Sequence, residues 1–305
     1  MHIALKAMPA EVAILPGAAT RVWTYQGEVL EGDPNAVQHL PGSYLGPILR
    51  LRKGQRVRVE FTNELAEASI VHWHGLHVPE AADGHPRLAV GPGETYTYEF
   101  NVASRAGTYW YHPHPHGRTG PQVYNGLAGL LIVSDDEEQN VGLPDGAHDL
   151  PLVLQDRTFD AQNQLVYLPN GMRDRINGFL GEQILVNGEP DYSLSVATRV
   201  YRLRVLNGSN SRTYKLAWDD GTPITVLATD GGLLEKPIQR EYVTLSPGER
   251  VELWADCSQA AVGDTVRLSS LPFYGTEASG MLSSDAELEN GAEFTILRMR
   301  VEREE

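Results

Sequence analysis

Short stretches of alternating apolar and polar residues, separated by turn formers, constrain the fold of this chain most. In residues 55–61 (QRVRVEF), valine and phenylalanine alternate with polar or charged side chains, and the pattern returns in residues 95–100, 199–206 and 249–254. Because successive side chains of a strand point to opposite faces, this period predicts half-buried strands. Turn formers such as Gly91-Pro92-Gly93 separate them. The sequence therefore predicts an all-β fold with at most short helices.

The length of 305 residues predicts two domains, each large enough for its own core. The acidic, turn-rich segment 135–146 is typical of a linker, so we expect one β-sandwich over residues 1–140 and a second over 141–305. Residues 53–59 and 247–253 share a turn glycine, a polar residue and Arg-Val. This match favours an internal duplication, but any exposed strand after a turn can produce it.

Composition and the first residues exclude several classes of function. A net charge of −15 argues against nonspecific binding to nucleic acid or to an anionic membrane surface. No apolar run approaches the ~18–20 residues of a membrane-spanning helix, so we expect no membrane partner. The single cysteine, Cys257, excludes an internal disulfide and any cysteine-rich metal site. The stretch Met1–Lys6 is too short for an export signal and lacks a cleavage site.

Histidines gather in two clusters, and each cluster contains a His-X-His pair. His72 and His74 form one pair, and His112 and His114 form the other. In a strand both histidines of a pair point to the same face, so two such strands side by side would bring four imidazoles together. Imidazole donors without a thiolate or carboxylate favour copper or zinc. A lone pair of this kind is usually an ordinary surface feature, but two in one domain favour a metal site.

The remaining histidines fit this site less well. His77 and His116 follow the two pairs and are better explained as hydrogen-bonding partners of a ligand or of the backbone. We interpret His2, His39 and His148 as ordinary surface or hydrogen-bonded residues.

The two histidine motifs, together with their flanking residues, resemble the first two copper motifs of multicopper oxidases, a family that includes laccases, bilirubin oxidases and cuprous oxidases. The matching segments are residues 72–75 (HWHG) and 107–117 (GTYWYHPHPHG). Further segments resemble the strand that closes the first domain of the family and landmarks of the second: residues 126–133, 149–156, 181–188 and 202–208. The resemblance covers the whole chain and implies cupredoxin-like Greek-key β-sandwich domains.

The resemblance also implies roles for individual residues. Family members reduce oxygen to water at a trinuclear copper cluster that eight histidines hold between the first and third of three cupredoxin domains. His72 resembles the first-domain ligand of the type 2 copper, and His74, His112 and His114 resemble ligands of the type 3 pair. Asp83, followed by Gly84, resembles the acidic residue that assists proton delivery to oxygen, although an ordinary Asp-Gly turn explains it too.

Other family features are missing from these 305 residues. The third-domain motifs that carry the remaining four cluster ligands are not found, and no histidine follows Cys257 to form a type 1 copper site, so Cys257 is expected to be a small buried residue. We therefore expect the first two domains of a three-domain oxidase, with no copper ligands in residues 141–305. Family resemblance implies a periplasmic or secreted location.

Partners and alternatives follow from the same resemblance. The parent protein would couple oxidation of a small reducing substrate, such as a phenol or a metal ion, to reduction of O2. A third cupredoxin domain or a symmetry-related subunit would complete the cluster and cover the partly apolar histidine face, and the chain alone would be inactive. The alternatives are a two-domain oxidase with a cluster shared between subunits, a non-catalytic copper-binding protein, and a scaffold that has lost metal; the four histidines argue against the scaffold.

Overall fold

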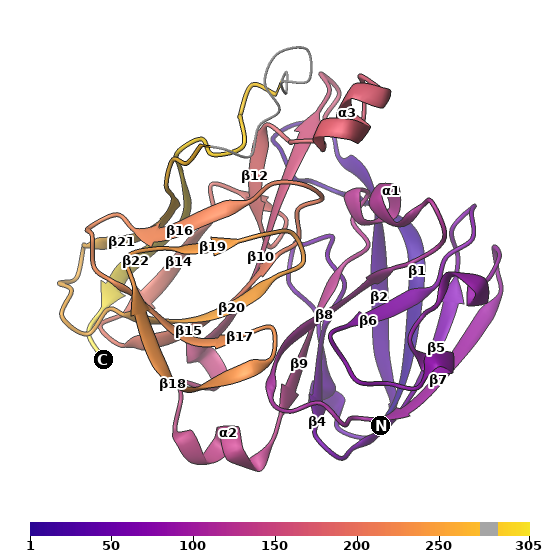
Figure 1. Cartoon of the computed structure of the whole chain (residues 1–305), viewed down its shortest axis with the longest axis horizontal. Coiled ribbons are helices and arrows are strands. Elements are labelled where there is room, and N and C mark those ends of the chain that lie inside the picture. Colours follow the sequence, from indigo (N-terminus) through magenta and orange to yellow (C-terminus); the bar gives the residue numbers. More distant parts are fainter. Residues whose placement is uncertain (275–285) are drawn as a thin grey trace. The chain divides into compact units, whose positions relative to one another are not determined.

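The computed structural model describes residues 1–274 and 286–305, and nearly all of its regular secondary structure is β-strand (Figure 1). Its residues group into two compact units. The first comprises residues 1–142, 163–165 and 230–232, and the second comprises residues 143–162, 166–229 and 233–305. The all-β prediction is confirmed, and each helix in the described part of the chain is at most six residues long. None of these helices has the length and apolar character needed to cross a membrane.

The first unit contains two sheets, with strand orders β2-β1-β5-β7 and β3-β4-β9-β8-β6. The strands are β1 (His2–Val12), β2 (Thr20–Glu31), β3 (Val37–Gln38), β4 (Ile48–Arg52), β5 (Arg56–Asn63), β6 (Val71–His74), β7 (Thr95–Asn101), β8 (Gly107–Pro113) and β9 (Gly129–Ser134). The helices are α1 (Thr119–Tyr124) and α2 (Asp136–Val141), with short 3-10 turns at Pro34–Ala36, Glu80–Ala82 and Pro86–Leu88.

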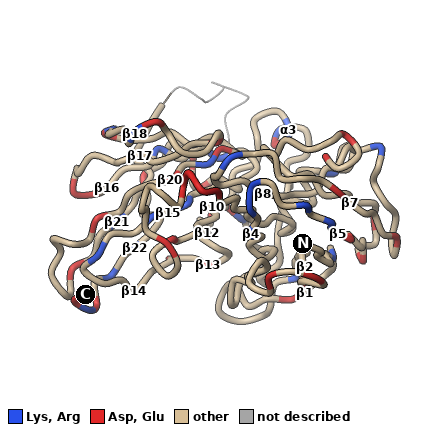
Figure 2. The backbone as a smooth tube through the Cα atoms, turned by 90° about the horizontal axis from the view of Figure 1, so that it is seen from below, with Lys and Arg blue, Asp and Glu red and all other residues tan. Residues whose placement is uncertain are grey.

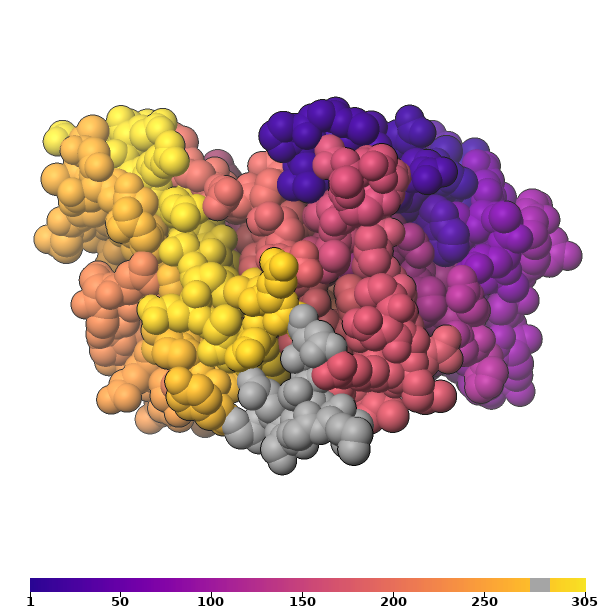
Figure 3. Space-filling model, turned by 90° about the horizontal axis from the view of Figure 1, so that it is seen from above, coloured from indigo at the N-terminus to yellow at the C-terminus, as the bar shows by residue number. Residues whose placement is uncertain are grey.

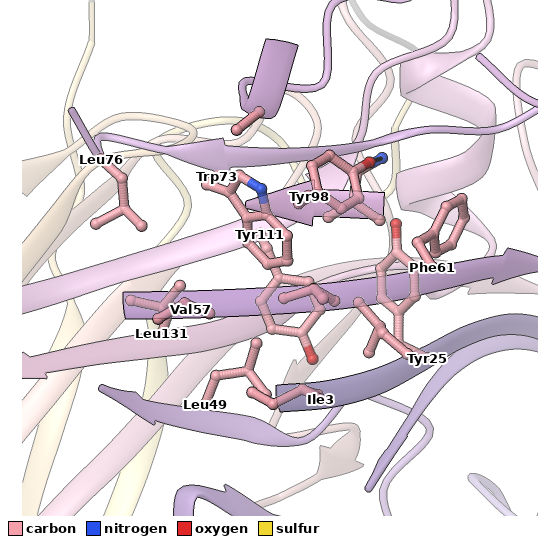
Figure 4. Packing of buried hydrophobic residues seen from close by; sticks show 14 of the residues in the cluster. Ile3, Tyr25, Leu49, Val57, Phe61, Trp73, Leu76, Tyr98, Tyr111 and Leu131 are labelled. Atoms are coloured by element: carbon pink, nitrogen blue, oxygen red, sulfur yellow. Dashed lines mark hydrogen bonds between the residues drawn. The ribbon is translucent and has the colours of Figure 1, made fainter. Parts of the chain in front are cut away.

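Aromatic and branched side chains from both sheets fill the space between them (Figure 4). Val57, Val59 and Phe61 of β5 are fully buried, as the alternation of residues 55–61 predicts. Trp73 of β6 and Tyr111 of β8 meet them from the other sheet, with ring centroids 5.8 Å apart. Side chains of this size contribute about 1.5–3 kcal/mol each when fully buried. This core fixes which face of β6 and β8 points inward and which is left for other contacts.

The second unit repeats this arrangement in the strand orders β13-β12-β10-β15-β20-β17-β18, with β11 beside β10, and β14-β22-β21-β16-β19. The strands are β10 (Asp149–Phe159), β11 (Leu165–Val166), β12 (Gln183–Val186), β13 (Glu189–Pro190), β14 (Ser193–Ala197), β15 (Val200–Asn207), β16 (Tyr214–Trp218), β17 (Ile224–Thr229), β18 (Gly232–Arg240), β19 (Val243–Leu245), β20 (Arg250–Asp256), β21 (Thr265–Ser270) and β22 (Phe294–Arg303). The remaining elements are α3 (Met172–Asn177) and a 3-10 turn at Gly146–His148.

The strand pairing shows that the two units share one topology. In the first unit β1 is parallel to β5 and β5 is antiparallel to β7; in the second, β10 is parallel to β15 and β15 is antiparallel to β20. The last strand of each unit, β9 or β22, is parallel to an earlier strand, β4 or β14, and the C-terminal residues, yellow in Figure 3, lie next to orange-coloured residues of the same unit. The similar segments 53–59 and 247–253 lead into β5 and β20, which are not equivalent in this topology. The sequence similarity of these two segments is therefore explained by a strand that follows a turn in each, and not by an internal duplication.

The predicted linker begins with an ordered helix. Asp135 caps α2 by accepting a hydrogen bond from the backbone N–H of Glu138, and it also accepts one from Ala106. Burial acts to raise the pKa of Asp135, but these two bonds and nearby basic groups outweigh it and lower the pKa. Gly142 ends the helix with φ +72°, a conformation that glycine adopts readily.

Candidate metal centre

The strands β6 and β8 lie side by side (Figure 1). They carry His72, His74 and His112, and His114 follows β8 directly. Their antiparallel register places His72 opposite His112 and His74 opposite Trp110. Residues opposite each other share a face of the sheet, so both histidine pairs point away from the core that Trp73 and Tyr111 fill. His114 lies just after β8, where its N–H donates to Ile70 O at 2.9 Å and continues the ladder.

All four imidazoles come together on this face. The ring centroid of His72 lies 5.7 Å from that of His74, 5.3 Å from that of His112 and 5.3 Å from that of His114. The rings of His112 and His114 are 6.0 Å apart. One ring nitrogen from each of His72, His74 and His112 lies within 4.8 Å of the other two. Separations of this size allow several rings to contact the same small group of ions.

Backbone carbonyls decide which nitrogens are available to a metal. His72 Nδ1 lies 2.7 Å from Asp83 O, and His112 Nδ1 lies 2.9 Å from Pro113 O. A carbonyl oxygen only accepts hydrogen bonds, so both Nδ1 atoms carry the proton and each Nε2 presents a lone pair. His74 presents Nδ1 instead, 3.3 Å from His112 Nε2. Backbone anchoring of this kind is typical of metal-binding histidines.

Burial and the neighbouring rings favour the neutral form of His112. Burial, together with the nearby rings of His72, His74 and His114, outweighs the hydrogen bond to Pro113 and lowers the pKa of His112 to about 3. At neutral pH this ring is therefore uncharged, and uncharged imidazole is the form that binds metal. The donor set contains nitrogen only, which suits copper or zinc better than calcium or magnesium. The residues present fit a copper site.

Asp83 follows a 3-10 turn and touches the cluster through two atoms. Its carbonyl holds His72, and its carboxylate Oδ1 lies 3.3 Å from the same Nδ1. The carboxylate is 46% exposed, so it contacts both His72 and solvent. Gly84 allows this approach, because a Cβ there would lie 2.0 Å from Val71 O, and φ is +75°. A larger residue at Gly84 would move Asp83 away from β6.

A polar network anchors the loop that follows His114. Gln122 of α1 is fully buried; it accepts from Ser69 Oγ at 2.8 Å and donates to Ala68 O at 2.9 Å and to Glu67 at 2.8 Å. Arg118 donates to both carboxylate oxygens of Glu67. These bonds fix residues 115–124 to the segment that leads into β6. They therefore hold the ends of both histidine strands together.

Replacing Glu67 with glutamine should weaken this network in a pH-dependent way. Partial burial acts to raise the pKa of Glu67, but the bonds from Arg118 and Gln122 outweigh it and lower the pKa below 4.5. A carboxyl group whose pKa is lower in the folded than in the unfolded state stabilises the fold at pH values above its unfolded pKa. This contribution is lost as the pH falls through its folded pKa. Glu67→Gln should therefore cost about 1 kcal/mol at pH 7 in denaturant unfolding, and the cost should be smaller at pH 3.

The matched control for this experiment is Glu137→Gln. Glu137 is 71% exposed and lies 3.7 Å from Arg105, so its replacement should change the unfolding free energy by less than about 0.5 kcal/mol at both pH values. An unfolding free energy of Glu67→Gln equal to that of the unaltered chain at pH 7 would contradict the network.

The other histidines lie apart from this group of rings. His77 and His116 are exposed, and their expected hydrogen bonds to a ligand or the backbone stay a prediction. His2 Nε2 lies 3.0 Å from Glu60, His39 Nε2 lies 3.0 Å from Gly27 O, and the ring of His148 is 5.5 Å from that of Tyr201. Ordinary hydrogen bonds and packing account for these three.

Two further residues complete the comparison with the sequence. Cys257 is fully buried directly after β20, and burial raises the pKa of its thiol to about 11, so it is a protonated core residue as expected.

Trp110 was not among the expected site residues, although it shares the histidine face. The signal was present in the sequence, because Trp110 stands two positions before His112 and therefore points the same way.

Comparison with known proteins gives a consistent result. A family model described as multicopper oxidase matches residues 11–138. The multicopper oxidase mco of Staphylococcus aureus is 40% identical over 218 residues, which are 72% of this chain and 48% of that protein. The cell division protein FtsP of Edwardsiella tarda is 40% identical over 220 residues, 72% of this chain and 46% of that protein.

Solved structures extend this likeness over the second unit. The crystal structure of the McoA multicopper oxidase from Aquifex aeolicus matches 100% of this chain and 62% of its own, with a TM-score of 0.84 and 37% identity. The cupredoxin-like fold expected from the sequence is thereby confirmed. The chain spans about half the length of the curated relatives it matches. It belongs to the multicopper oxidase family.

Proposed function

We propose that this chain carries half of the copper ligands of an oxygen-reducing multicopper oxidase. The observation that supports this most directly is the convergence of two His-X-His pairs on one sheet face, with His74 Nδ1 and His112 Nε2 3.3 Å apart. Two nitrogens that each bind one ion at about 2 Å lie about 3 Å from each other. His74 and His112 would therefore share one copper ion of the type 3 pair.

The other two histidines would serve neighbouring ions. His72 presents Nε2 because Asp83 O holds its Nδ1, and it would bind the type 2 copper. His114 lies at the end of β8 and would bind the second type 3 ion. Copper, when bound, supplies the one-electron steps through which oxygen is reduced to water. The contribution of this chain is to hold four imidazoles close together on one face of the sheet.

Asp83 would handle protons beside the cluster. Its carboxylate contacts the His72 ring and is also exposed to solvent, so it is placed to pass a proton between water and the site. The carbonyl of the same residue orients His72. One residue would thus combine a positioning role and a proton-transfer role.

Completion of the site requires groups from outside these residues. A third cupredoxin domain, or a second subunit, would supply the remaining cluster ligands and the type 1 copper that accepts electrons from a small reducing substrate. The only cysteine, Cys257, is buried with a raised thiol pKa and has no histidine after it in the sequence, so it does not supply that centre. The 305-residue chain alone should therefore bind copper without turning over.

The test combines copper stoichiometry with oxygen uptake. Purified chain should retain copper after dialysis, show no intense blue thiolate band, and consume no oxygen with a phenolic substrate and saturating copper. Sustained oxygen uptake would contradict the assignment of half a site. A folded chain that retains no copper at neutral pH would contradict the metal centre itself.

A second candidate is a non-catalytic role, which the similarity to the cell division protein FtsP favours. A scaffold of that kind has no need of four clustered imidazoles, two of which backbone carbonyls hold in place. Copper retention measured in the same experiment separates the two candidates, because a scaffold should lose the ion as readily as its His74→Ala variant does.

A further inference from the structure

Trp110 is the one non-histidine ring in contact with two of the clustered imidazoles among the described residues. Its ring centroid lies 5.0 Å from that of His74, with 30° between the planes, and 4.2 Å from that of His112, with 38°. The residue is 6% exposed. It lies opposite His74 in the strand register and two residues before His112, so both contacts follow from the sheet geometry.

Packing in the hydrophobic core does not account for the position of the Trp110 side chain. Its neighbour Tyr111 points into the packed space between the two sheets, so Trp110 points to the opposite face, toward the histidines. Its indole Nε1 is buried without a hydrogen-bond partner among the described residues. Trp110 therefore contacts His74 and His112 through the flat face of its ring and not through Nε1.

These contacts restrict the two rings whose nitrogens converge. The hydrogen bond from Nδ1 to Pro113 O restrains rotation of the His112 ring about χ2, and the direction of Nε2 depends on that same rotation. An indole stacked at a small angle against both imidazoles limits that rotation for His74 and His112 together. His72 is oriented by another device, the carbonyl of Asp83.

We propose that Trp110 is a positioning residue that stacks on His74 and His112 and keeps their ligand nitrogens directed at one metal ion. The proposal deepens the copper site and rests on it for the identity of the ion. The stacking itself is a property of the metal-free protein. The two parts can therefore be tested separately.

The test compares three substitutions of Trp110 in the 305-residue chain. Phenylalanine keeps a flat ring, leucine keeps apolar bulk without a flat face, and alanine removes both. Copper titration should give an affinity for Trp110→Phe within about threefold of the unaltered chain, whereas Trp110→Leu and Trp110→Ala should lose about tenfold to a hundredfold, as for other groups that orient metal ligands. Trp23→Leu, which alters a half-buried tryptophan on β2, is the matched control and should leave affinity unchanged.

A second readout needs no copper. Imidazole nitrogen resonances of the metal-free chain should shift or broaden for His74 and His112 in Trp110→Leu, and should stay in place for His39. If Trp110→Leu matched Trp110→Phe in both copper affinity and imidazole resonances, Trp110 would only fill space beside the histidines. That result would overturn the proposal. If the unaltered chain binds no copper, the copper site fails, and the resonances still decide whether Trp110 orients the rings.

Discussion

Copper affinity of the 305-residue chain should fall at least about a hundredfold when His74 and His112 are both replaced by alanine. Their Nδ1 and Nε2 atoms are 3.3 Å apart, so the double change removes both donors that we propose for one ion. A hundredfold loss corresponds to about 2.7 kcal/mol of binding free energy. Titration with copper at neutral pH, followed by metal analysis after dialysis, measures it.

Control variants separate loss of a ligand from loss of the fold. His39→Ala removes an exposed histidine whose ring bonds only a backbone carbonyl, and it should bind copper as the unaltered chain does. Because His112 is buried, the single variant His74→Ala is needed beside the double variant, with circular dichroism as the check on folding. Unchanged affinity in a folded double variant would refute the arrangement of ligands proposed here.

The strands and the histidine face were within reach of sequence reasoning because both depend on local geometry. A period of two residues fixes which side chains share a face, whatever the rest of the molecule does. The burial of Val57, Val59 and Phe61 and the convergence of His72 with His112 follow from that rule once two strands pair. The resemblance to a family supplied the pairing, which the period alone does not give.

The burial of charged side chains on β15 could not be predicted from this local alternation. The alternation of residues 199–206 indicates a strand whose arginines face solvent, yet the side chains of Arg202 and Arg204 are each only 3% exposed. They pair with Glu252 of β20 and Asp149 of β10. Figure 2 shows acidic and basic positions close together around the labels of β10, β15 and β20. An arginine is buried when its partners surround it, and those partners lie about 50 residues away in the sequence.

Trp110 was missed for a related reason. An aromatic residue inside a strand is most often part of a core, and three neighbouring aromatic residues, Tyr109, Tyr111 and Trp73, do belong to it. The spacing of two residues places Trp110 on the same face as His112, and the register of β6 against β8 adds that it lies opposite His74. Which of the two alternating aromatic sets lies beside the histidines of the neighbouring strand depends on how β6 and β8 pair.

The largest loss of stability should come from Arg212 in the second unit. This side chain is fully buried and donates to the Asp156 carboxylate at 3.0 Å, to Gly181 O at 2.8 Å and to two backbone carbonyls at positions 288 and 289. Asp156 is itself 2% exposed and also accepts from the Gly181 N–H. One guanidinium thus joins β10 to two loops that are distant in the sequence.

Replacing Arg212 with leucine should reduce the free energy of unfolding by about 3–5 kcal/mol, because the Asp156 charge stays buried without its cation. The double variant Arg212→Leu with Asp156→Asn should recover part of the loss, since removal of both charges leaves no unpaired ion.

Arg298→Leu is the control: Arg298 is 32% exposed and 3.6 Å from Asp191, and its loss should cost less than about 1 kcal/mol. Denaturant unfolding measures all three, and hydrogen exchange should show faster opening at residues 181 and 288–289. A loss below about 1 kcal/mol for Arg212→Leu would mean that water or a neighbouring group compensates the aspartate, and that the second unit does not depend on this ion pair.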